Sequence, residues 1–85
     1  MSNSELEKLV KKHLRSIAPE ADLEELSPDD ELGSALDIDS MDFYSMMVAI
    51  SEELDVEIPE EEYGKLRDLN SIVRFLDRSG VKLAR

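Results

Sequence analysis

The 85-residue chain contains no cysteine and a single histidine, His13. Without thiols it has no disulfide bond, no thiolate metal site and no cysteine nucleophile. His13 has no serine, aspartate or second histidine at a useful spacing, and a catalytic histidine needs oriented partners, so we expect a surface or boundary position. The three glycines are scattered, which excludes a glycine-rich phosphate loop. The composition therefore predicts neither an enzyme nor a metal-binding protein.

Lysine and arginine are absent from residues 19–62, which hold 17 of the 21 acidic residues. The net charge of the chain is −11. A central region that carries only negatively charged side chains argues against nucleic-acid binding, because phosphate neutralisation needs basic side chains. The negative charge favours electrostatically steered docking onto basic protein surfaces. The alternative interpretation is that the charge serves only to keep the protein soluble.

Long apolar runs are also missing, so we expect no membrane span. The stretch MSNSELEKLVKKHL lacks the apolar core of a secretory signal. Together with the absence of cysteine, this predicts a cytoplasmic protein. The length predicts one domain over residues 1–85 with a small core, a frayed tail at 81–85, and a monomer.

Apolar spacing predicts an all-α fold, a small four-helix bundle of three main helices and one short third helix. The first helix ends near Ala18 because Pro19 follows. The second runs from about Ser40 to Leu54. A short, weak helix follows Pro59, and the last helix is predicted to be capped by Asn70 and to end at Gly80.

A long connection over residues 19–38 precedes the second helix. Ser27-Pro28-Asp29-Asp30 has the order of an N-cap, a proline and first-turn acids, which predicts a short helical turn there. The connection is too rich in leucine for a disordered linker. We therefore expect its apolar residues to pin it onto the bundle.

The second helix is apolar on more than one side. One stripe is predicted to face the core, and it consists of Phe43, Met46, Met47, Ile50 and Leu54. Met41, Tyr44 and Val48 lie on another side, rimmed by Asp39, Asp42 and Glu52. A fully packed central helix would explain these residues, and a partly exposed partner surface is the functional alternative.

The segment Asp37-Ile38-Asp39-Ser40-Met41-Asp42 marks the start of this helix. Asp39 suits the N-cap, and Asp42 three residues on completes a capping-box-like pair. Ser40 then occupies the first helical position, where the macrodipole favours an anion on its hydroxyl. The pattern fails as a calcium loop, since glycine and glutamate are missing from its required places. Ser40 lacks a base and an oxyanion hole, so we expect it to be modified rather than to catalyse.

Asp39-Ser40-Met41, continued by DSMDFYSMMVAISEELDVEIP and on to Leu76, resembles the acyl carrier proteins. The resemblance implies that 4′-phosphopantetheine from coenzyme A is attached to Ser40 and carries acyl groups as thioesters. The implied partners are a phosphopantetheinyl transferase and acyl-processing enzymes with basic docking surfaces. By resemblance, Asp39, Asp42 and Glu52 meet those basic surfaces, Met41 and Val48 supply apolar contact, and the inner face opens beside the third helix to shelter a chain.

Several positions depart from the family pattern. Five residues, 34–38, separate Gly33 from Asp39, where one is usual, and Met41 replaces leucine. Ser45 and Ser51 stand where fatty-acid carriers often have glutamate. These departures argue against a role in bulk fatty-acid synthesis, and they indicate a specialised, discrete carrier dedicated to particular partners, as in a secondary lipid or polyketide pathway. Two alternatives stay open: an acidic helical interaction module without a prosthetic group, and a D-alanyl-type carrier, although Asp42 replaces the glycine usual there.

Overall fold

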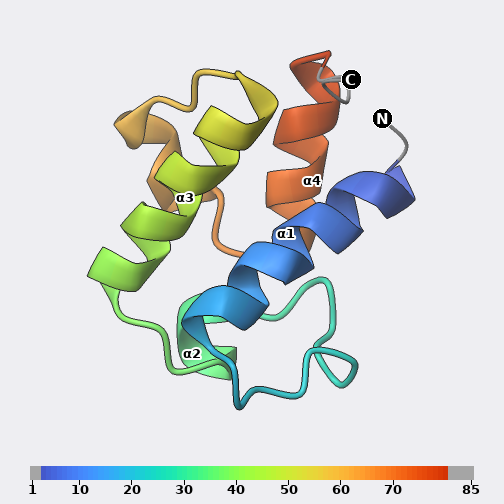
Figure 1. Ribbon diagram of the computed structural model, residues 1–85, viewed down its shortest axis with the longest axis vertical. Coiled ribbons are helices and arrows are strands. Elements are labelled where there is room, and N and C mark those ends of the chain that lie inside the picture. The colour runs from blue at the N-terminus through green and yellow to red at the C-terminus, as the bar shows by residue number, and fades with distance from the viewer. Residues whose placement is uncertain (1–2, 81–85) are drawn as a thin grey trace.

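The computed structural model describes residues 3–80, and within that range the chain is helical with no strand beyond one isolated bridge between Glu31 and Asp68. The predicted frayed tail at 81–85 lies outside the described residues. The elements in chain order are α1 (Asn3–Ile17), α2 (Leu32–Ala35), α3 (Ser40–Leu54), the 3₁₀ helix η1 (Glu60–Lys65) and α4 (Leu69–Arg78) (Figure 1). The all-α prediction is confirmed.

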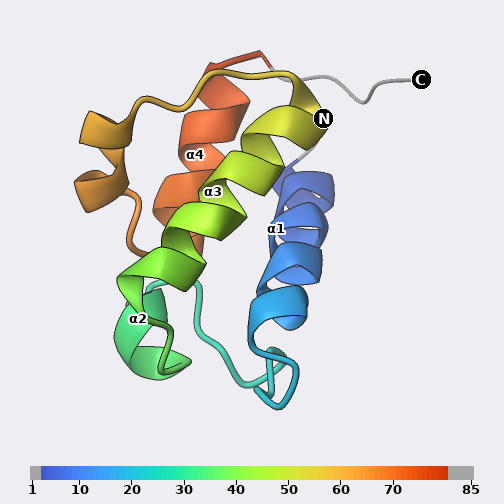
Figure 2. The same cartoon turned by 60° about the vertical axis from the view of Figure 1, so that its left-hand side comes forward.

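Helices α1, α3 and α4 form the body of the bundle, and α1 packs against both of the others (Figures 1 and 2). Apolar residues recur on α1 three or four positions apart, which places one side of the helix against the core. The buried residues of α1 are Leu6, Leu9, Val10 and Leu14. The helix ends one residue before Ala18, because Pro19 cannot continue it. None of the helices within residues 3–80 is long and apolar enough to cross a bilayer.

Helix α3 begins and ends close to its predicted bounds. The Asp39 carboxylate accepts the Asp42 N–H at 2.8 Å, which confirms the N-cap. Asp55 closes the helix in the left-handed region, at φ 53°. The inward stripe is confirmed, with Phe43 half-buried and the other four residues, Met46, Met47, Ile50 and Leu54, buried.

The prediction for the connection was wrong in one place. A helical turn was expected at Ser27–Asp30, but that stretch forms only a turn, and the short helix is α2. The pinning itself is confirmed: Leu23, Leu26, Leu32 and Ile38 are all buried. Backbone bonds tie the connection to the start of α4, because the Leu32 N–H donates to the Arg67 carbonyl at 2.8 Å and the Asn70 N–H to the Pro28 carbonyl at 3.0 Å.

The N-cap of α4 is Asp68 and not Asn70, which corrects a second prediction. The Asp68 carboxylate accepts the Ser71 N–H at 2.7 Å, and the Asp68 N–H donates to the Ser71 hydroxyl at 3.3 Å. This pair is a complete capping box. The Asn70 amide instead donates to the Asp29 carboxylate at 2.6 Å. Asn70 therefore bonds to the connection over residues 19–38 and does not cap α4.

Gly64 and Gly80 offer a matched test of backbone freedom. Gly64 lies within η1, and a Cβ added there meets nothing within 4 Å, whereas Gly80 has φ +70° just after α4. We expect Gly64→Ala to raise the free energy of unfolding by about 0.4–1 kcal/mol, through a less flexible unfolded chain. Gly80→Ala should lower it by about 1–2 kcal/mol. Urea unfolding measures the free energy of unfolding of both variants. Equal changes would contradict the different backbone conformations of Gly64 and Gly80.

Lys12, His13 and Glu53 join α1 to the end of α3. The Lys12 ammonium lies 2.9 Å from one Glu53 oxygen, and the His13 Nε2 lies 2.8 Å from the other. The His13 side chain is 15% exposed, so the expected boundary position is confirmed. Hydrogen bonds from Lys12 and then His13 lower the pKa of Glu53 below its usual value, with the Lys12 and His13 charges adding to the effect.

This cluster predicts a small pH-dependent stability. Because the pKa of Glu53 is lowered on folding, its contribution is present above the ordinary pKa near 4.5 and is lost as pH falls through the lower folded value. Glu53→Gln should therefore cost less than about 1 kcal/mol at pH 7, and the cost should be smaller at a pH well below 4.5. Thermal unfolding at both pH values measures it, with Glu52→Gln as the control. A cost that is equal at both pH values would contradict the prediction.

Candidate functional site

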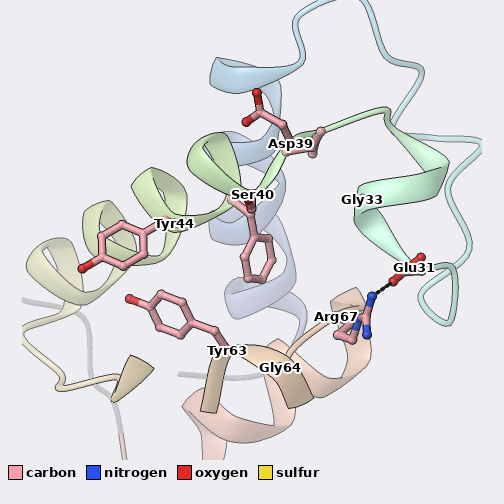
Figure 3. A pocket seen from close by; sticks show the side chains of 10 residues that line it. Glu31, Gly33, Asp39, Ser40, Tyr44, Tyr63, Gly64 and Arg67 are labelled. Carbon is pink, nitrogen blue, oxygen red and sulfur yellow. Dashed lines mark hydrogen bonds and ion pairs between the residues drawn. The ribbon is translucent and has the colours of Figure 1, made fainter. Parts of the chain in front are cut away.

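Ser40 is the first residue of α3 and is exposed, as predicted. Figure 3 shows it beside Asp39, at the point where the loop becomes the helix. Because Asp39 accepts the third N–H of the helix, the N–H groups of Ser40 and Met41 remain directed outward at its positive end. Within residues 3–80 no side-chain partner holds the Ser40 hydroxyl. The position suits a bulky anionic group on that oxygen.

A pocket of about 400 Å³ opens directly beside Ser40. Its walls come from α2, the first turns of α3, and η1 (Figure 3). The lining residues are Glu31, Gly33, Ile38, Asp39, Ser40, Phe43, Tyr44, Tyr63, Gly64 and Arg67. Pockets of this size and largely apolar character hold small organic ligands in many proteins.

Three rings, which we call the aromatic cluster, form one side of this pocket: Phe43, Tyr44 and Tyr63. The Phe43 and Tyr63 centroids lie 6.2 Å apart at 86°, and those of Tyr44 and Tyr63 lie 5.4 Å apart at 67°. Both arrangements are edge-to-face, the geometry that ring quadrupoles favour. The interaction of the Tyr44 hydroxyl with the Glu60 carboxylate raises the pKa of Tyr44, and burial raises that of Tyr63.

The opposite side of the pocket is polar. The Arg67 guanidinium pairs with the Glu31 carboxylate there, as Figure 3 shows. The Ser34 hydroxyl donates to the second Glu31 oxygen at 2.6 Å. The Ser34 bond, and then the Arg67 charge, lower the pKa of Glu31. Both side chains of the ion pair are well exposed, so the pair contributes little to the stability of the fold. It forms the polar rim of the pocket.

The residues predicted to form a partner surface lie on the outer side of α3 and are exposed or half-buried. We call Met41, Tyr44 and Val48 the outer patch; Met41 is 78% exposed, Tyr44 is 45% exposed and Val48 is half-buried. Asp39, Asp42 and Glu52 are all exposed. Met41, Val48 and Glu52 share a face because they are seven and eleven residues apart on the helix. Tyr44 belongs both to the outer patch and to the pocket.

Sequence reasoning did not single out Tyr63 or the Glu31–Arg67 pair as parts of the site. Tyr63 follows Phe43 by twenty residues, and Arg67 follows Glu31 by 36, so no local spacing connects them. The signal that was available is compositional: three of the four aromatic residues lie within the short third helix or near the start of the second. His13 is bound to Glu53, and it does not line the pocket that Ser40 lines.

Comparison with known proteins agrees with this geometry. The family described as a phosphopantetheine attachment site matches residues 8–76. An acyl carrier protein of Campylobacter fetus is 34% identical over 62 residues, which cover 73% of this chain and 75% of that protein. An acyl carrier protein of Bdellovibrio bacteriovorus is 35% identical over 51 residues, 60% of each chain. A mitochondrial acyl carrier protein of Saccharomyces cerevisiae is 35% identical over 52 residues, covering 61% of this chain and 42% of that protein.

The match to residues 8–76 spans most of the chain and includes α3 and the pocket. The chain belongs to the acyl carrier protein family, whose cofactor is 4′-phosphopantetheine. The residues present fit that group: an exposed serine hydroxyl at the positive end of a 15-residue helix, with an apolar pocket beside it.

Proposed function

We propose that Ser40 carries 4′-phosphopantetheine and that the protein, which is not itself an enzyme, presents acyl groups to enzymes of a fatty-acid, lipid or polyketide-type pathway. The observation that carries this proposal is the position of Ser40 within the family match: an exposed hydroxyl with no side-chain partner among residues 3–80, at the start of α3. When bound, the group supplies a terminal thiol on which acyl groups form thioesters.

The attachment needs chemistry that the chain does not provide. The Ser40 oxygen forms a bond to the phosphorus of the pantetheine side of coenzyme A, and the pyrophosphate bond breaks with departure of adenosine 3′,5′-bisphosphate. The serine proton passes to a base on the phosphopantetheinyl transferase, because no histidine lines the site. Asp39 holds the start of α3 in place by its bond to the Asp42 N–H.

Partner enzymes would dock on the outer patch and its acidic rim. Asp39, Asp42 and Glu52 are exposed on a stretch without lysine or arginine, so they attract basic surfaces and speed the encounter. Met41 and Val48 supply the apolar centre of such a contact. We place the protein in the cytoplasm as a monomer and treat residues 1–85 as one carrier domain.

Intact mass spectrometry tests the proposal. The protein is incubated with coenzyme A, Mg²⁺ and a promiscuous phosphopantetheinyl transferase, and a mass gain of one arm is expected. Ser40→Ala should show no gain, while Ser45→Ala, which removes another exposed serine from α3, should gain the arm as the unchanged protein does. No gain in the folded unchanged protein, with several transferases, would overturn the proposal and favour an interaction module without a prosthetic group.

A further inference from the structure

Aromatic side chains are scarce in this protein, and they are concentrated at one place. The chain has two tyrosines and two phenylalanines, and three of the four line the pocket beside Ser40. The fourth, Phe75, packs against the core from α4, as Phe43 and Tyr63 also do, but Phe75 does not line the pocket. A core of this size is otherwise built from leucine, isoleucine, valine and methionine. Phe43 and Tyr63 therefore serve both the core and the pocket, and the pocket holds aromatic rings that the fully buried core lacks.

The rings are placed so that they remain available to a ligand. Phe43 and Tyr63 are half-buried and Tyr44 is 45% exposed, so each ring keeps part of its surface on the pocket side. Gly33 and Gly64 contribute no side chain to the walls, and a Cβ at Gly64 would meet nothing within 4 Å. The pocket thus combines about 400 Å³ of space with three ring surfaces.

We propose that this pocket selects acyl groups that end in an aromatic ring over straight saturated chains of the same carbon number. The proposal rests on the proposed function, because the acyl group reaches the pocket on an arm attached to Ser40, at its rim. An aromatic ring placed against the cluster gains a quadrupole attraction beyond the burial of its area, and an alkyl chain does not. Polar ring substituents face the Glu31–Arg67 rim, where a carboxylate and a guanidinium offer hydrogen bonds.

The competing explanation makes the opposite prediction. If the pocket bound any apolar group, the fraction of time that an acyl group spends inside it would increase with the apolar area that the group removes from water. A nine-carbon saturated chain is then retained better than a nine-carbon acyl group with a phenyl ring, because the chain is the more hydrophobic of the two. Comparing these two cargoes therefore separates ring recognition from simple burial.

The test uses the full chain loaded through a promiscuous transferase from 3-phenylpropanoyl or nonanoyl coenzyme A. Loading is confirmed by intact mass, and cleavage of the thioester by hydroxylamine is then followed. We expect the phenylpropanoyl form to be cleaved about 3- to 10-fold more slowly than the nonanoyl form. Equal cleavage, or slower cleavage of the nonanoyl form, overturns the inference. Failure of both cargoes to attach at Ser40 overturns the proposed function instead.

Variants locate the effect within the molecule. Tyr63→Leu removes the ring that both other rings contact, and it should abolish the difference between the two cargoes. Phe75→Leu makes the same change outside the pocket and should leave the difference intact. Should Tyr63→Leu not fold, as judged by circular dichroism, Phe43→Leu serves the same purpose. A difference that survives the loss of a cluster ring, or that Phe75→Leu abolishes, would overturn the inference.

Discussion

Replacing Ile50 with alanine is expected to lower the free energy of unfolding by about 2–5 kcal/mol. Ile50 is fully buried at the centre of α3, and the helices around it leave a cavity when its side chain is shortened. A domain of 85 residues has a total stability of about 4–13 kcal/mol, so the loss is a large share of it. The variant should be partly unfolded at 37 °C.

The matched control is Val48→Ala on the same helix. Val48 is half-buried in the outer patch, so shortening it should cost less than about 1 kcal/mol. Chemical denaturation with a common m-value measures both variants. Equal losses would mean that α3 is packed on both sides, and they would remove the distinction between an inner core face and an outer partner face.

Among changes that leave Ser40 in place, the largest functional effect is expected from the double charge reversal Asp42→Lys and Glu52→Lys. Both side chains are exposed on the outer side of α3, and neither makes a side-chain bond that the N-cap needs. The Asp42 N–H still donates to Asp39 after the change. Because steering by opposite charges raises association rates, we expect kcat/KM of the phosphopantetheinyl transferase to fall by about 10- to 100-fold at low salt.

The control for net charge is the pair Glu24→Lys and Glu25→Lys. These residues are exposed on the connection between α1 and α2, and they change the total charge by the same amount. We expect this variant to retain most of its kcat/KM. The difference in kcat/KM between the two variants should become smaller at 0.5 M salt, because the salt screens the charges strongly. Equal losses would show that overall charge, and not the acidic rim of the outer patch, draws the transferase.

The site was predictable from the sequence wherever short-range chemistry decides it. Asp39 caps α3 because its carboxylate needs to reach only three residues along the chain. Ser40 follows as the first helical residue, and the apolar period then divides α3 into a buried side and an outer side. The bounds of α3, the buried Ile50 and the exposed Met41 were all accessible to this reasoning.

Sequence reasoning was wrong at two places, the start of α4 and the connection before α3. Asn70 is a fair N-cap by type, but its amide is engaged by Asp29, 41 residues earlier, while Asp68 and Ser71 supply the capping box. The short helix of the connection forms at α2 and not at Ser27, where the loop is tied to the start of α4. At the start of α4 the capping box is itself local, because Asp68 and Ser71 are only three residues apart, so a short-range signal was overlooked there. In the connection, tertiary hydrogen bonds overrode propensity.

By itself, the sequence determined the helical class, the faces of the helices and the position of Ser40 at the start of α3, because hydrogen bonds and apolar period act over a few residues. Only the tertiary structure decided that Phe43, Tyr44 and Tyr63 meet in one pocket beside that serine, with Glu31 and Arg67 opposite. Those residues come from three separate segments, and their meeting depends on how buried leucines and isoleucines fold the loops back onto the bundle.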